Sequence, residues 1–137
     1  MKVKALKVFV YGTLKPGEVN YNLYCAGKVV EAKKAIAFGE LFDLPLGYPA
    51  MIPGKNPVQG FLLTFADPSM LRVLDALEDY DPYRVAAENE YNRQQIEIYD
   101  LTRETLGIAW AYLMTFEQVK HFQGSPIPSG CWSQFRC

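Results

Sequence analysis

Runs of β-branched and aromatic residues alternate with glycine- and proline-rich breaks along most of the chain. Residues 6–11 are β-branched and aromatic and end in a continuous apolar stretch, which is typical of a strand that enters a core, and Gly12 ends it. Residues 58–65 have the same character. Residues 95–99 alternate apolar and polar positions with a period of two, which predicts a half-buried strand. We therefore expect the chain to be built mainly from strands.

Three further segments carry strand signals. Residues 29–44 mix Val, Ile, Phe and Ala around Gly39, which predicts one or two strands with a bend or bulge at that glycine. Residues 83–85 and 107–114 also have strand composition. Residues 45–57 are punctuated by prolines and glycines, so we expect a loop-rich stretch there. The pattern as a whole predicts about five to seven strands.

One segment has the periodicity of an amphipathic helix. Asp67 can cap its first turn, and Pro68 can occupy the first helical position without losing a needed hydrogen bond. Apolar residues then recur at helical spacing up to about Tyr80, and Pro82 prevents much continuation. A shorter helix is expected over residues 21–26.

These elements predict an α+β fold, with a mixed or antiparallel, barrel-like β-sheet and one main helix. No repeat or linker divides the chain, so we expect a single domain over residues 1–137. Half of the residues are hydrophobic and 21% are charged, which is typical of a globular domain. A domain of this size needs neither disulfides nor a metal to hold its core.

The charge balance argues against a nucleic-acid partner. Lys and Arg total 14 against 15 for Asp and Glu, and no basic run is available to neutralise a phosphate backbone. The apolar stretches are too short for a membrane span, and the stretch after the basic residues 1–7 is unlike a secretory signal. Three cysteines without C-x-x-C spacing fit a reducing compartment, so we expect a cytoplasmic protein. No feature of the sequence indicates an oligomeric state.

The first candidate site is the tetrapeptide Tyr11-Gly12-Thr13-Leu14, where the first strand ends. A glycine there lets the backbone turn sharply, so that successive N–H groups can converge on an anion or a developing oxyanion. An ordinary strand-ending turn is the alternative interpretation. A phosphate loop is not indicated, because the pattern G-x-x-x-x-G-K-[ST] is missing.

The second candidate is an acidic group at the end of the predicted helix, formed by Asp75, Glu78, Asp79 and Asp81. Glu78 follows Leu74 by four positions and so falls on the apolar side of the helix. Burial, the negative end of the helix dipole and the neighbouring Asp79 and Asp81 would raise the pKa of Glu78, which suits a general base near neutral pH. A solvated acidic helix end is the alternative. No metal is expected, because the EF-hand pattern is missing and one histidine leaves too few zinc ligands.

Two further groups could contact a substrate. Tyr83 and Arg84 could supply a hydroxyl and a positive charge to a substrate carboxylate, although Arg84 equally suits a structural role beside the acidic group. Tyr112 shares a strand face with Trp110, where packed core aromatics are the alternative to a substrate wall.

The turn and the acidic helix end occur together in the γ-glutamylcyclotransferase-like proteins, and the sequence resembles this family. Residues 8–17 resemble its opening strand and turn, and residues 74–80 followed by Tyr83-Arg84 resemble its helix-end motif. Asp79 and the Lys15-Pro16-Gly17 extension are closest to the γ-glutamylamine cyclotransferase branch. Other short motifs follow in the expected order, namely Gly39-Glu40-Leu41, Tyr48-Pro49-Ala50, Val58-Gln59-Gly60, Trp110-Ala111-Tyr112 and Ser129-Gly130-Cys131-Trp132.

The resemblance implies an enzyme that cyclises a γ-glutamyl amine or γ-glutamyl amino acid to 5-oxoproline and releases the amine, an intramolecular aminolysis with no cofactor or metal. It implies that Glu78 is the general acid/base. The residues expected to bind this small-molecule substrate are Tyr11, Gly12, Thr13, Leu14, Tyr83, Arg84 and Tyr112. Two alternatives stay open: a non-catalytic binding or interaction module that keeps the pocket, and a thiol enzyme that pairs Cys131 with His121.

Overall fold

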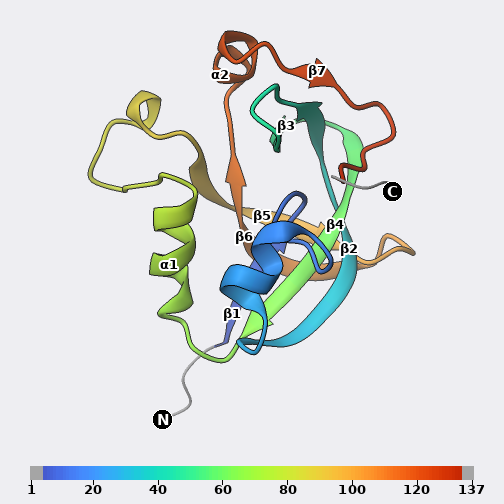
Figure 1. The fold of residues 1–137 in the computed structure, drawn as a ribbon. Coiled ribbons are helices and arrows are strands. Elements are labelled where there is room, and N and C mark those ends of the chain that lie inside the picture. The colour runs from blue at the N-terminus through green and yellow to red at the C-terminus, as the bar shows by residue number, and fades with distance from the viewer. Residues whose placement is uncertain (1–4, 134–137) are drawn as a thin grey trace.

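Residues 5–133 are described in the computed structural model of the chain, where they form a seven-stranded mixed sheet with α-helices at its borders (Figure 1). The strands are β1 (Leu6–Val10), β2 (Val29–Asp43), β3 (Pro49–Pro53), β4 (Asn56–Phe65), β5 (Asn92–Tyr99), β6 (Thr105–Leu113) and β7 (Ser125–Pro126). The helical elements are the π-helical turn η1 (Tyr21–Cys25), α1 (Met70–Leu77), the 3₁₀ turn η2 (Ala86–Glu88) and α2 (Phe116–His121). The predicted α+β class and the mixed sheet are confirmed.

The sheet runs in the order β3-β2-β4-β1-β6-β5, and β7 pairs with the end of β2. Its paired strands are antiparallel except β1 and β6, which run parallel where Val8 faces Trp110. β5, the last strand in this order, also pairs with β2, the second strand, where Tyr99 faces Ile36. Within residues 5–133, β2 therefore pairs with four strands over different parts of its length, namely β3, β4, β5 and β7.

The apolar run of β1 is continuous because both faces of this strand are buried. Val8 and Val10 pack in the same core cluster as Leu74 of α1. Phe9 packs in a second cluster on the other face, together with Ile98 of β5. The core thus lies on both sides of β1, and the strand carries the chain out of the core directly into the candidate turn at Gly12.

Helix α1 is shorter than the sequence pattern predicts, because it begins at Met70 instead of Pro68 and ends before Tyr80. The Asp67 carboxylate caps the turn before the helix by accepting a hydrogen bond from the N–H of Ser69 at 2.9 Å. Met70 and Leu74 are buried, and the partly buried Leu71 and Leu77 pack against the same cluster. The apolar stripe therefore fixes which face of α1 meets the sheet.

Strand β3 lies in the stretch that the sequence predicts to be a loop. Pro49 and Pro53, at its two ends, pair with Asp43 and Gly39 of β2. β3 is at the edge of the strand order, where a proline that cannot donate a ladder hydrogen bond is tolerated. The expectation of a loop was wrong because pairing with β2, and not the local composition, makes residues 49–53 a strand.

Of the bend or bulge predicted at Gly39, the bulge is not present. Its pairings with Pro53 and Asn56 continue the regular register, and the irregularity of β2 lies instead between Val29 and Glu31. A Cβ at Gly39 would lie 2.6 Å from the carbonyl oxygen of Ile52. The glycine is therefore needed for close packing between strands.

Two other elements differ from expectation. Residues 83–85 form a turn and lead into η2, and they have no strand partner in the described chain. Helix α2 was not predicted by apolar periodicity, but Thr115 and Gln118 form a capping box at its start, which is a sequence-level signal. No helix within residues 5–133 is long and apolar enough to cross a membrane.

Candidate active site

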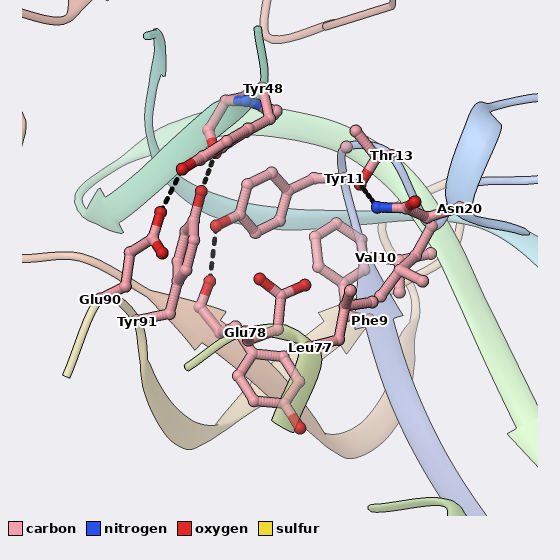
Figure 2. Close-up of a pocket in the computed structure, with 14 residues that line it drawn as sticks. Phe9, Val10, Tyr11, Thr13, Asn20, Tyr48, Leu77, Glu78, Glu90 and Tyr91 are labelled. Carbon is pink, nitrogen blue, oxygen red and sulfur yellow. Dashed lines mark hydrogen bonds between the residues drawn. The ribbon is translucent and has the colours of Figure 1, made fainter. Parts of the chain in front are cut away.

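The end of β1 and the end of α1 meet at a cavity of about 200 Å³ (Figure 2). Its walls come from the first turn, the loop before β3, the end of α1 and the segment before β5. The lining residues are Phe9, Val10, Tyr11, Gly12, Thr13, Leu14, Asn20, Tyr48, Pro49, Leu77, Glu78, Glu90, Tyr91 and Tyr112. Every predicted site residue except Tyr83 and Arg84 lies in this cavity.

Glu78 is held in place by the way in which α1 ends. The N–H of Tyr80 bonds to the carbonyl of Asp75 at 2.9 Å, and the N–H of Asp79 bonds to that of Ala76 at 3.3 Å. These two bonds are the Schellman arrangement, which leaves Glu78 as the last residue before the chain turns away. Asp79 takes the left-handed conformation that this motif requires, with φ of 52°. Glycine adopts this conformation without strain, so Asp79 occupies a position that would favour glycine.

The carboxylate of Glu78 points into the cavity, below the Tyr11 ring and beside the Phe9 ring (Figure 2). Burial among these side chains, followed by the negative charge of Glu90, raises the pKa of Glu78 from 4.5 to about 8. The predicted direction agrees, but the charged neighbour is Glu90 and not Asp79 or Asp81. A carboxyl group that titrates near neutral pH can accept and return a proton during a reaction.

The four residues of the Tyr-Gly-Thr-Leu turn line the cavity. The carbonyl of Gly12 accepts from the N–H of Lys15 at 3.0 Å, and Asn20 holds Thr13 through a backbone bond at 2.9 Å and a side-chain bond at 2.8 Å. Among residues 5–133, no acceptor is bonded to the N–H of Thr13 or of Leu14. The turn therefore offers backbone donors on the cavity wall, where an anionic group of a ligand would be bound.

Gly12 serves close packing and not a left-handed turn. Its φ is not among the positive values of the described chain, but a Cβ there would lie 2.8 Å from Cγ of Pro49. The neighbouring Tyr11 hydroxyl donates to the carbonyl of Tyr112 at 2.5 Å and accepts from the N–H of Met51 at 3.2 Å. Tyr11 thus joins the turn to β6 and β3 and fixes the cavity wall.

A second acidic side chain in the cavity, Glu90, was not predicted from the sequence. Its carboxylate accepts a hydrogen bond from the Tyr48 hydroxyl, and the neighbouring Tyr91 hydroxyl donates to the carbonyl of Pro49 at 2.6 Å (Figure 2). Tyr48 belongs to the Tyr48-Pro49-Ala50 motif, but Glu90 follows an irregular loop that has no periodicity. Only the folding of that loop against β3 brings Glu90 to the cavity.

Tyr112 connects the cavity to a partly buried ion pair. Its hydroxyl donates to Asp75 at 2.7 Å, and the other oxygen of Asp75 accepts from Arg93 at 2.6 Å. The Arg93 guanidinium lies 4.5 Å from the centre of the Trp110 ring and 5.0 Å from that of Tyr80. This network ties α1 to β5 and β6 three residues before Glu78.

Tyr83 and Arg84 do not reach the cavity, in contrast to the sequence expectation. Tyr83 is 97% exposed to solvent. Arg84 bonds to the carboxylate of Asp79 at 3.1 Å and to its carbonyl at 2.9 Å. Neither side chain lines the cavity, and the contacts of Arg84 with Asp79 are those expected from the structural alternative.

The thiol alternative has no support in the geometry. Cys131 is disulfide-bonded and does not line the cavity, and His121 lies at the end of α2 instead. Within residues 5–133, no group of three or more His, Cys, Asp or Glu side chains is arranged to hold a metal ion. The carboxylates that line the cavity are those of Glu78 and Glu90.

Comparison with known proteins decides the family. The family described as "Gamma-glutamyl cyclotransferase, AIG2-like" matches residues 8–134. The chain belongs to this family. It is 33% identical over 127 residues to a gamma-glutamylcyclotransferase homologue of Vibrio cholerae, and the match covers 93% of the chain and 95% of that protein.

Two further similar proteins are a named enzyme and a solved structure. A protein of Niallia circulans named "Gamma-L-glutamyl-butirosin B gamma-glutamyl cyclotransferase" is 34% identical over 73 residues, which cover 53% of this chain and 46% of that protein. The crystal structure of an AIG2-like protein from Mus musculus matches with a TM-score of 0.69 at 22% identity, over 96% of this chain and 90% of that one. The second match shows the shared fold.

Proposed function

We propose that this protein converts a γ-glutamyl amine or γ-glutamyl amino acid into 5-oxoproline and a free amine, with Glu78 as general acid/base. The observation that carries the proposal is one partly exposed carboxyl group inside the cavity, whose pKa is raised to about 8 by desolvation and by the charge of Glu90. It shares a cavity of about 200 Å³ with the backbone donors of the Gly12 turn. The family assignment and the name of the Niallia circulans relative support the reaction type.

The reaction is a ring closure within the substrate. The α-amine attacks the γ-carbonyl carbon and forms the C–N bond of a five-membered lactam, while the bond from that carbon to the leaving nitrogen breaks. The α-amine is mostly protonated at neutral pH and cannot attack in that form. Glu78 takes one proton from the α-ammonium before the attack, and the attacking nitrogen loses a second proton once the new C–N bond has formed. Both protons pass to the leaving nitrogen, Glu78 carrying them in turn, so that the amine departs as an ammonium ion and no proton is gained or lost overall.

The turn supplies the complementary half of the site. The N–H groups of Thr13 and Leu14 bind an anionic group of the substrate, either its α-carboxylate or the oxyanion that forms as the amine attacks. The small cavity holds the glutamyl part in the folded conformation that ring closure needs, which lowers the entropic part of the barrier. No step requires a metal or an organic cofactor.

The direct test is mass-spectrometric detection of 5-oxoproline after incubation with γ-glutamyl amines, γ-glutamyl amino acids, γ-glutamyl-ε-lysine and glutathione. Glu78→Gln keeps the shape of the side chain and removes the base, so we expect release to fall by at least about 100-fold. Glu31→Gln is the matched control, because Glu31 is exposed on β2 and does not line the cavity. A folded Glu78→Gln variant with full activity would refute the assignment. A folded wild-type protein that binds these donors without release would favour a binding module.

A further inference from the structure

The turn that carries Glu78 is contacted on both sides by one side chain of another element, Arg93 of β5. The Arg93 guanidinium bonds to the Asp75 carboxylate at 2.6 Å, and its central carbon lies over the Tyr80 ring, 5.0 Å from the ring centre. Asp75 precedes Glu78 on α1, and Tyr80 follows it. The carbonyl of Asp75 also accepts the N–H of Tyr80 at 2.9 Å. Arg93 therefore holds both ends of a closed turn that has Glu78 between them.

The contacts of this ion pair fix its direction. The Arg93 guanidinium also lies over the Trp110 ring at 4.5 Å, and the side chains of Arg93 and Asp75 are only 17% and 15% exposed. A planar guanidinium that stacks on rings and bonds to a carboxylate has a defined orientation, which a flexible ammonium group lacks. The second oxygen of Asp75 accepts from the Tyr112 hydroxyl at 2.7 Å. The end of α1 therefore cannot rotate without the loss of one of these contacts.

Stability alone does not account for a charged pair at this position. An ion pair that is mostly shielded from water gains little over apolar side chains of similar size, because both charges lose hydration. In addition, the Nε of Arg93 is buried and has no hydrogen-bond acceptor within residues 5–133, which costs free energy. The pair supplies a bond between defined donor and acceptor atoms, and such a bond fixes the direction of the attached segment.

The direction of this segment matters because Glu78 has to meet one nitrogen of the substrate. The Glu78 carboxylate points into the cavity, whereas neither Arg93 nor Asp75 lines it (Figure 2). Arg93 can therefore influence the reaction only through a residue that does line the cavity. A displacement of a catalytic group by about 1 Å can cost on the order of 100-fold in rate.

We infer that Arg93 is a positioning residue, which acts through Asp75 and Tyr80 to hold the Glu78 carboxylate in its reactive orientation. This inference rests on the proposed function and deepens it. It makes the reaction depend on a side chain of β5 that touches no part of the substrate.

The test variant combines Asp75→Asn with Arg93→Met. It removes both charges together, so that no shielded charge is left without its partner and the net charge stays the same. We expect kcat for 5-oxoproline release to fall at least about tenfold, with KM within about twofold of wild type, because the walls of the cavity are kept. Arg72→Met is the matched control, since Arg72 is exposed on α1 and does not line the cavity, and it should leave both constants unchanged.

A titration of Glu78 separates positioning from a general loss of structure. Burial is the larger cause of the raised pKa of Glu78, so a carboxylate that leaves its fixed position gains water. In the combined variant, the pKa of Glu78 should therefore fall from about 8 to about 7 or below. Carbon-13 NMR of the glutamate carboxyl groups measures this pKa without a substrate, and Glu78→Gln identifies the signal. The variant keeps the titratable side chains that line the cavity with Glu78, namely Tyr11, Tyr48, Glu90, Tyr91 and Tyr112.

A folded combined variant with the kcat of wild type would overturn the inference, and so would a loss of activity in which the pKa of Glu78 is unchanged. If this variant does not fold, Arg93→Lys takes its place, because it keeps the charge and removes the planar guanidinium. It should lower kcat at least about threefold and lower the pKa of Glu78, and wild-type values of both would overturn the inference. Absence of 5-oxoproline with the wild-type protein would refute the proposed function, and the titration would still decide whether Arg93 holds Glu78 in place.

Discussion

Removing the charge of Glu78 should stabilise the protein, and the gain should grow with pH. Burial raises the pKa of this carboxyl group from 4.5 to about 8, so the folded state holds the proton more tightly than the unfolded state does. Between these two pH values, the folded protein binds more protons, and its free energy of unfolding therefore falls as the pH rises. Because Gln does not titrate, the free energy of unfolding of Glu78→Gln should not fall with pH for this reason.

The size of the effect follows from the two pKa values. A difference between 4.5 and about 8 corresponds to a total of about 5 kcal/mol, at about 1.4 kcal/mol per pKa unit. Compared with low pH, where Glu78 is protonated in both states, the free energy of unfolding of the wild-type protein is lower by less than about 1 kcal/mol near pH 5. Near pH 8 it is lower by about 4 kcal/mol. The free energy of unfolding of Glu78→Gln, relative to wild type, should therefore rise by about 3 kcal/mol between these two pH values.

The assay is urea unfolding of wild type and Glu78→Gln near pH 5 and near pH 8, with the free energy taken from the midpoint and slope. The comparison across pH isolates the charge, because the packing of the Gln side chain is the same at both values. Glu31→Gln should show a pH-dependent change below about 0.5 kcal/mol, because an exposed carboxylate stays hydrated. An equal effect of Glu78→Gln at both pH values would refute a buried carboxylate with a raised pKa.

Four other outcomes are expected. kcat/KM should rise with pH up to about pH 8, where the free base of Glu78 forms, and a pH-rate profile that is flat between 6 and 9 would contradict this role. Gly12→Ala should lower both the melting temperature and 5-oxoproline release, because its Cβ would lie 2.8 Å from a ring carbon of Pro49; unchanged kinetics would mean that the turn adapts. Arg93→Met breaks a 2.6 Å ion pair that is largely shielded from water, and should cost about 3 kcal/mol in urea unfolding. Tyr83→Ala should leave kcat/KM within about twofold of wild type, because a side chain that is 97% exposed lies away from the cavity; a loss of tenfold or more would return Tyr83 to the site.

Local patterns were sufficient for the elements whose signals lie within a few residues. The run of residues 6–11 identifies β1 because a strand buried on both faces needs apolar side chains at successive positions. The spacing of Leu74 and Glu78 places the carboxylate on the buried side of α1, because side chains four apart share a helix face. These two features predict both halves of the candidate site.

Pairing between distant segments determines which of the remaining segments form strands, and the local patterns do not show this pairing. β3 is a strand because β2 pairs with it along its length, although its prolines are typical of a loop. Residues 83–85 have strand composition but no partner among the described residues, and Tyr83 and Arg84 turn away with them. A segment forms a strand only where another strand pairs with it, and the composition of the segment does not show whether such a partner is present.

The sequence by itself determined the family, the strand-turn motif and the acidic helix end, because each is a contiguous set of residues. The tertiary structure alone decided that Glu90, and not Asp79 or Asp81, is the charge beside Glu78. The reason is geometric. A Schellman turn directs the residues after Glu78 outward, and the chain must fold back along the loop before β5 to bring Glu90 to the same cavity.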